Sequence, residues 1–170
     1  MAAKLSLRDY QLELSARLQR AQTDGRAASK LGLEAGGGAW LVDLTEAGEM
    51  IPVPPIAAVP LARPWFRGVA NIRGNLYSVT DLAAFLGGAA TAVTGQARLL
   101  VISERFRAGC ALLVGRSLGL RKSGELEPRP GGGAGSKWTR AEYTDAEGKR
   151  WRELDVPALV RDPEFLDVSI

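Results

Sequence analysis

The residue types that most often carry enzyme chemistry are scarce in this chain of 170 residues. There is no histidine, which removes the commonest general base, the commonest metal ligand and every Ser-His or Cys-His nucleophilic pair. The single cysteine, Cys110, begins an apolar run, CALLVG, that is typical of a buried thiol, and no disulfide can form within the chain. Acidic residues are scattered and no Walker-type phosphate loop occurs. We therefore expect no catalytic residues, no cofactor and no metal site.

The polar residues with the most informative spacing suit binding instead, and they lie in residues 65–86, WFRGVANIRGNLYSVTDLAAFL. Gly68 and Gly74 can adopt the positive φ that tight turns require. The mixed apolar and polar residues on either side of Gly74 predict a hairpin that presents Asn71 and Arg73 near its tip. A charged side chain at such a tip contributes little to a core, so Arg73 is a candidate binding residue.

The elements that precede this hairpin are a helix and short strands. Ser6 can cap a helix over residues 7–20, which carries an apolar stripe at helical spacing. Residues 23–30 read as a loop with helical tendency. Three glycines at positions 36–38 then break the chain before a first strand over residues 39–44.

Further short strands follow on both sides of the hairpin. Three prolines between residues 52 and 55 interrupt a strand that begins at Met50. Because proline cannot donate a ladder hydrogen bond, this segment should lie at a sheet edge, leave the sheet early or bulge. Residues 98–103 and 110–115 read as a buried hairpin, and residues 138–154 as another.

An internal repeat relates the two halves of the sequence. YSVTDLAAFL, residues 77–86, aligns with WRELDVPALV, residues 151–160. Each segment reads as a strand followed by an aspartate that caps a short helix, so Asp81 and Asp155 are expected to be helix caps and not catalytic acids. Many short strands and this halving predict an all-β fold of two related small barrels.

The hairpin segment closely resembles the signature of CheW-like coupling proteins, a Gly-Val-x-Asn-(Leu/Ile)-Arg-Gly run followed by a strand and an Asp-Leu dipeptide. The fitting positions are Gly68, Val69, Asn71, Ile72, Arg73, Gly74, Val79, Asp81 and Leu82. The resemblance implies two SH3-like five-stranded β-barrels around a shared hydrophobic core, here with an N-terminal helix and a short C-terminal helix. We assign residues 1–35 to an N-terminal helical lead and residues 36–170 to the CheW-like domain, with pseudo-repeated barrels at roughly 36–90 and 97–160.

The same resemblance implies a non-enzymatic adaptor that couples methyl-accepting chemoreceptors to a CheA-type histidine kinase. Its partners would be the receptor's signalling tip and the kinase regulatory domain. The receptor groove of such proteins is formed between the barrels, and the matching positions here are Ile56, Val59, Asn71 and Arg73. For Ile56 and Val59, simple burial is an equal alternative.

The long N-terminal lead is similar to that of the CheW-like adaptors of type IV pilus chemosensory systems. This similarity implies a role in twitching motility, with the protein in the cytoplasm and recruited to membrane-associated receptor arrays. No stretch approaches the roughly 20 apolar residues that cross a bilayer, so we expect no direct membrane insertion.

Three other functions stay open at this point. Small β-barrels also bind single-stranded nucleic acid on aromatic platforms and basic grooves. The aromatic residues near arginines here are Trp65, Phe66, Trp138 and Trp151, although the net charge is only +3. The CheW-like portion of a kinase or of a fused receiver adaptor is a second alternative, but no ATP-binding or receiver segment occurs in the sequence. An enzyme is the third, and the lack of histidine disfavours it.

Overall fold

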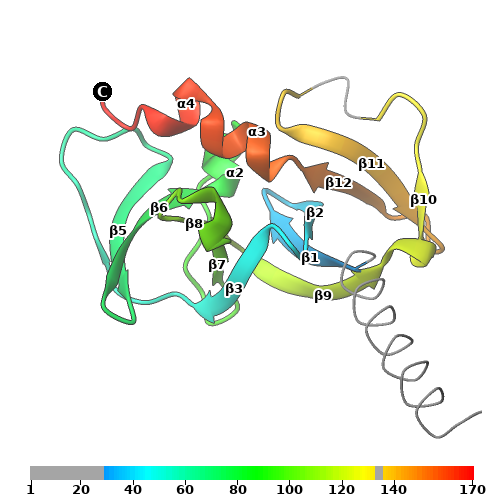
Figure 1. Ribbon diagram of the computed structural model, residues 1–170, viewed down its shortest axis with the longest axis horizontal. Helices are drawn as coiled ribbons and strands as arrows, with labels where there is room; N and C mark the ends of the chain where they lie inside the picture. Colours follow the sequence, from blue (N-terminus) through cyan, green and yellow to red (C-terminus); the bar gives the residue numbers. More distant parts are fainter. Residues whose placement is uncertain (1–28, 133–135) are drawn as a thin grey trace, which may run out of the picture.

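The computed structural model describes residues 29–132 and 136–170, so the helix expected over residues 7–20 lies outside the described residues. The described chain forms twelve β-strands and a few short helical segments, which confirms the all-β fold class (Figure 1). In chain order the elements are β1 (Ser29–Ala35), β2 (Gly38–Asp43), β3 (Ala47–Pro52), β4 (Ile56–Ala57), β5 (Phe66–Ile72), β6 (Asn75–Asp81), α2 (Leu82–Phe85), β7 (Arg98–Ile102), η1 (Glu104–Phe106), β8 (Cys110–Val114), β9 (Arg116–Lys122), η2 (Ser123–Glu125), β10 (Leu126–Pro128), β11 (Thr139–Asp145), β12 (Arg150–Leu154), α3 (Val156–Arg161) and α4 (Pro163–Leu166).

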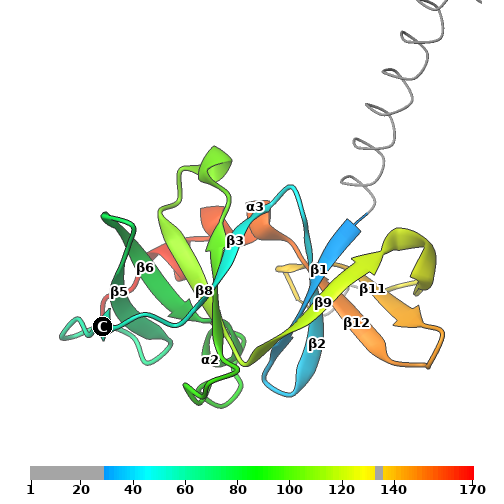
Figure 2. The ribbon, with the colours of Figure 1, turned by 90° about the horizontal axis from the view of Figure 1, so that it is seen from below.

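The strands form two six-stranded sheets that lie side by side (Figure 2). The sheet with the order β3-β7-β8-β6-β5-β4 is called barrel 1 below, and the sheet with the order β10-β11-β12-β2-β1-β9 is called barrel 2. Each has five strands of at least five residues and one short edge strand, β4 or β10. The two edge strands of each sheet follow each other in the chain across a short connection. Each sheet therefore curls until its edges approach, consistent with an SH3-like barrel.

The two barrels do not divide the chain at the boundaries that the sequence suggested. Barrel 1 uses residues 47–114, whereas barrel 2 uses residues 29–43 and 116–154, so the expected ranges of roughly 36–90 and 97–160 are corrected. The reason is that the N-terminal hairpin of the described chain pairs with strands from the C-terminal half. In barrel 1, β8 of the β7–β8 hairpin pairs in parallel with β6, and in barrel 2 the N-terminal β1–β2 hairpin supplies the equivalent strand, β2, parallel to β12.

The first described strand also lies earlier than expected. β1 covers Ser29–Ala35, residues expected to lie in a loop and in the helical lead. It pairs with β2 through a tight connection at Gly36 and Gly37, both with positive φ. Leu31, Leu33 and Ala35 alternate with less apolar residues, and this period of two was the available signal for a strand.

The prolines of the β3–β4 segment lie at the end of an edge strand and after it, where no N–H is needed for a ladder hydrogen bond. β3 ends at Pro52 and β4 begins at Ile56, and the two strands occupy opposite edges of barrel 1. The pairing of β3 with β7 also shifts register between Ala47 and Met50. Of the three alternatives that the prolines left open, the edge position is therefore confirmed.

A shared hydrophobic core joins the two barrels. Its buried residues come from β1, β2 and β12 of barrel 2, from β7 and β8 of barrel 1, and from α2, α3 and α4. At its aromatic centre, the ring of Phe85 lies 5.0 Å from Trp65, 4.6 Å from Trp138 and 5.3 Å from Phe165, measured between ring centroids. Trp65 precedes β5 and Trp138 precedes β11, so the repeated halves each contribute one tryptophan to Phe85.

Candidate functional site

The hairpin tip between β5 and β6 is a two-residue turn, Arg73–Gly74. Both residues have positive φ, 52° and 89°, as in the type I′ turn that suits right-twisted strands. The side-chain Oδ1 of Asn71 accepts a hydrogen bond of 2.8 Å from the Gly74 N–H, which fixes the turn. Arg73 holds a left-handed backbone that its Cβ disfavours, and such strain is often kept where a side chain must be displayed.

The Arg73 side chain is 77% exposed and its Nη2 forms a 2.8 Å ion pair with Oε2 of Glu49. Glu49 lies on β3, at the edge of barrel 1 opposite to β4 and β5. The ion pair therefore joins the edge strand β3 to the β5–β6 hairpin. A pair this exposed contributes only about 0–1 kcal/mol, so a partner's carboxylate can replace Glu49 at little cost.

The two apolar residues expected beside Arg73, Ile56 and Val59, differ in how far they are exposed to solvent. Ile56 on β4 lies opposite Ala70 and packs against the interior cluster of barrel 1. Val59 is 42% exposed in the segment after β4. Ile56 is therefore half-buried, whereas Val59, Asn71 and Arg73 are exposed.

Gly68 explains how β4 approaches β5 so closely. Its φ is +126°, and a Cβ at this position would collide with the carbonyl oxygen of Ala57. Only glycine fits this contact, so the first glycine of the hairpin segment secures β4 to the sheet. Gly74, with a φ of +89°, meets nothing within 4 Å and serves the turn alone.

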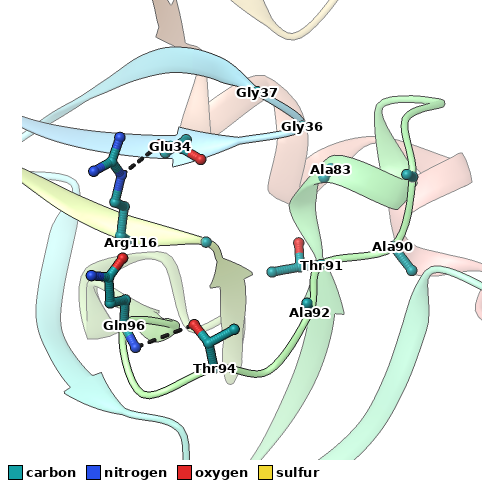
Figure 3. A pocket seen from close by; sticks show the side chains of 12 residues that line it. Glu34, Gly36, Gly37, Ala83, Ala90, Thr91, Ala92, Thr94, Gln96 and Arg116 are labelled. Atoms are coloured by element: carbon teal, nitrogen blue, oxygen red, sulfur yellow. Dashed lines mark hydrogen bonds and ion pairs between the residues drawn. The ribbon is translucent and has the colours of Figure 1, made fainter.

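A groove of about 450 Å³ lies between the barrels, on another part of the surface (Figure 3). Its walls are the β1–β2 turn of barrel 2, α2, and the linker over residues 89–96 of barrel 1. Along one side, Arg116 Nε pairs with Glu34 Oε2 at 2.6 Å. None of Ile56, Val59, Asn71 and Arg73 lines this groove. The structure thus places the four expected receptor positions on barrel 1 and not in this groove between the barrels.

Asp81 connects the hairpin to that groove. Its side chain is fully buried and caps α2 by accepting from the Ala84 N–H at 3.3 Å. It also accepts from the N–H and hydroxyl of Thr91, at 2.7 and 2.8 Å, and lies 3.4 Å from the Arg67 guanidinium. Thr91 lines the groove, so Asp81 fixes the groove wall as well as the helix.

Asp155 occupies the equivalent position in barrel 2. It caps α3 through the Ala158 N–H at 3.0 Å. The main chain repeats as well, because the Asp81 N–H donates to the Trp65 carbonyl and the Asp155 N–H donates to the Trp138 carbonyl, both at 2.8 Å. The two aspartates are structural residues of one repeated hairpin-and-helix unit.

The comparisons with known proteins agree with this architecture. A family described as the CheW-like domain matches residues 30–164. The chain belongs to the CheW-like domain family. Protein PilI of Pseudomonas aeruginosa is 32% identical over 108 residues, and the match covers 64% of this chain and 60% of that relative's length. The crystal structure of the scaffolding protein TtCheW from Thermoanaerobacter tengcongensis covers 75% of this chain and 88% of its own, with a TM-score of 0.63 and 14% sequence identity, a likeness of fold.

An ionic network joins the two barrels of this CheW-like domain. Arg140 on β11 donates to Oε1 of Glu46 at 2.7 Å, and Glu46 lies just before β3. Arg140 also lies 3.5 Å from Glu153 on β12, which accepts from Lys30 and from the Tyr143 hydroxyl, each at 2.7 Å. Burial raises the pKa of Glu46, although the hydrogen bond from Arg140 opposes this effect. Burial and the bond to Glu153 raise the pKa of Tyr143 to about 12.

The thiol of Cys110, the single cysteine of the sequence, lies in the core. Cys110 is 2% exposed, and burial raises the pKa of its thiol to about 12, so the thiolate is not available near neutral pH. Within residues 29–132 and 136–170, no cluster of three or more acidic, histidine or cysteine side chains could hold a metal ion. No helix in the same residues is long and apolar enough to span a membrane.

Proposed function

We propose that this protein is a non-enzymatic adaptor that couples methyl-accepting chemoreceptors to a CheA-type histidine kinase. The observation that carries the proposal is the display of Arg73 on a fixed, strained turn within the segment that matches the coupling-protein signature. Family membership supports it, as does the likeness of fold to a protein described as a scaffold. No phosphoryl group is transferred by this chain in the proposed role.

The receptor's helical signalling tip contacts the exposed side of barrel 1 around Arg73, Asn71 and Val59, with Ile56 supporting this surface from below. The planar guanidinium of Arg73 can bind a carboxylate or free helix carbonyls in a bidentate manner. It does so by leaving Glu49, whose ion pair is exposed and weak. The kinase regulatory domain docks on a separate surface.

The cellular setting is the second part of the proposal. The likeness to Protein PilI, together with the long N-terminal lead, favours a chemosensory system that controls type IV pilus twitching motility. The protein works in the cytoplasm and is recruited to membrane-associated receptor arrays, where many weak contacts give lasting assembly.

The nucleic-acid alternative loses its main support. Trp40 and Trp151 are buried, 4% and 0% exposed. Trp65 and Trp138 pack against the shared core. None of the four tryptophans therefore offers a free platform on which bases could stack.

Replacing Arg73 tests the receptor contact. Loss of a charge-assisted hydrogen bond is worth roughly 1.5–3 kcal/mol, so Arg73→Ala should weaken binding of a receptor-tip fragment by about 10- to 100-fold. Binding of the kinase regulatory domain should be unchanged. Both affinities can be measured by isothermal titration calorimetry on the full chain.

Glu49→Gln is the matched control, because it breaks the same ion pair and leaves the arginine in place. It should retain receptor binding or improve it. Equal weakening by both variants would mean that the ion pair only shapes the barrel, and normal binding by Arg73→Ala would refute the assigned contact.

A further inference from the structure

Barrel 1 contains a gap one strand wide beside the hairpin tip. β6 pairs with β5 from Asn75 onward, but on its other side β8 begins to pair only at Ser78, opposite Cys110. β7 lies beyond β8, with Val101 opposite Ala111. Residues 75–77 of β6 therefore face the region beyond the end of β7, and no strand of the described residues lies between them.

A cleft of about 330 Å³ occupies this gap. Its apolar lining comes from Leu76 and Tyr77 of β6 and from Ile102 at the end of β7. Leu76 is 70% exposed, which is unusual for a large apolar side chain on a strand. Glu104 and Arg107 also line the cleft, so its wall carries one acidic and one basic side chain beside the apolar ones.

The main chain of β6 also directs hydrogen-bonding groups into the cleft. Alternate residues of an antiparallel strand direct their N–H and C=O toward and away from the partner strand. The Ser78 N–H points away from β5, because it donates to the Gly109 carbonyl at 2.9 Å. Leu76, two residues earlier, has the same direction. Its N–H and C=O therefore point to the place that β8 does not reach.

The loop before β8 keeps this place open. Arg107 and Gly109 both adopt left-handed backbone, with φ of 51° and 54°. Two such residues turn the chain away from the line of β8, so the strand cannot extend toward Leu76. For Arg107 this conformation is strained, and strain of this kind often marks a functional surface.

We infer that this cleft binds an extended peptide segment of a partner protein, which pairs with the main chain of Leu76 and inserts one apolar side chain between Leu76, Tyr77 and Ile102. An extended chain is the occupant that the hydrogen-bonding groups require, because a helix uses its own N–H and C=O internally. The contact is additional to those of the helical receptor tip and the folded kinase domain. It does not depend on the proposed coupling function.

A peptide selection on the full chain tests this inference. The probe is a phage-displayed library of linear five-residue segments, each with a central apolar residue and flanked by Gly-Ser spacers. Wild-type protein is the bait. Leu76→Arg places a charge in the cleft, and Leu120→Arg is the matched control, since Leu120 is a similarly exposed leucine, 63%, on β9 of barrel 2.

The inference predicts enriched peptides that lose about tenfold or more in affinity with Leu76→Arg and keep it with Leu120→Arg. It also predicts that a bound peptide slows hydrogen exchange at the Leu76 amide. Failure to enrich any peptide would overturn the inference. Enriched peptides that bind Leu76→Arg normally, or that leave the Leu76 amide unprotected, would overturn it as well.

Discussion

Replacing Asp81 with alanine should destabilise the fold far more than the same change at Asp155, although both aspartates cap short helices. Asp81→Ala removes the cap of α2 and both bonds to Thr91, at a side chain that is fully buried. A lost cap costs about 1 kcal/mol, and each of the two half-buried Thr91 donors left without an acceptor costs about 1–3 kcal/mol, so the total is roughly 3–7 kcal/mol. The Asp155 side chain is 29% exposed, and water can replace part of what its removal takes away. Asp155→Ala should therefore cost only about 1–2 kcal/mol.

Equilibrium unfolding in urea, monitored by tryptophan fluorescence, measures both losses. Thr91→Val isolates one of these bonds, because it deletes the hydroxyl bond to Asp81 and keeps the N–H bond. Its expected loss is about 1 kcal/mol. Equal destabilisation by the two aspartate variants would refute the reasoning, since it would mean that the bonds to Thr91 contribute nothing beyond the cap.

Two further predictions concern the contacts between the barrels. Phe85→Ala should cost about 3–5 kcal/mol, because the ring lies against Trp65, Trp138 and Phe165, and a smaller loss in urea unfolding would mean that the cluster closes over the cavity. Burial raises the pKa of Glu46, so ionisation of this carboxyl disfavours the folded state. The free energy of unfolding of wild type should be highest relative to Glu46→Gln at low pH, and this advantage should be lost as pH rises through the raised pKa of Glu46. Parallel curves of unfolding free energy against pH for the two proteins would contradict this.

Turns, helix caps and an edge position could be predicted from the sequence, because each depends on residues that are close together in the chain. The Arg73 turn follows from the glycine after it and the strands around it, and the caps at Asp81 and Asp155 follow from a strand ending at an acidic residue before an apolar helical pair. Prolines at residues 52–55 likewise indicated an edge position, because their lack of an N–H acts locally.

Features that depend on distant pairing could not be predicted in this way. The exchange of the β1–β2 hairpin into barrel 2 leaves no mark in the repeat, which covers only the hairpin-and-helix unit. The Glu49–Arg73 ion pair forms because barrel 1 curls and so brings β3 close to the β5–β6 hairpin. The outward or inward direction of Ile56 depends on its register with Ala70, which sequence alone does not fix.

The most direct test of the proposed coupling role is a three-component retention assay. A receptor signalling-tip fragment is immobilised, and the regulatory domain of a CheA-type kinase is passed over it with and without the full-length protein. The proposal predicts that the kinase domain is retained only when this protein is present, and that Arg73→Ala abolishes retention while Glu49→Gln does not. Failure of wild-type protein to bring the kinase domain to the receptor would contradict the coupling function.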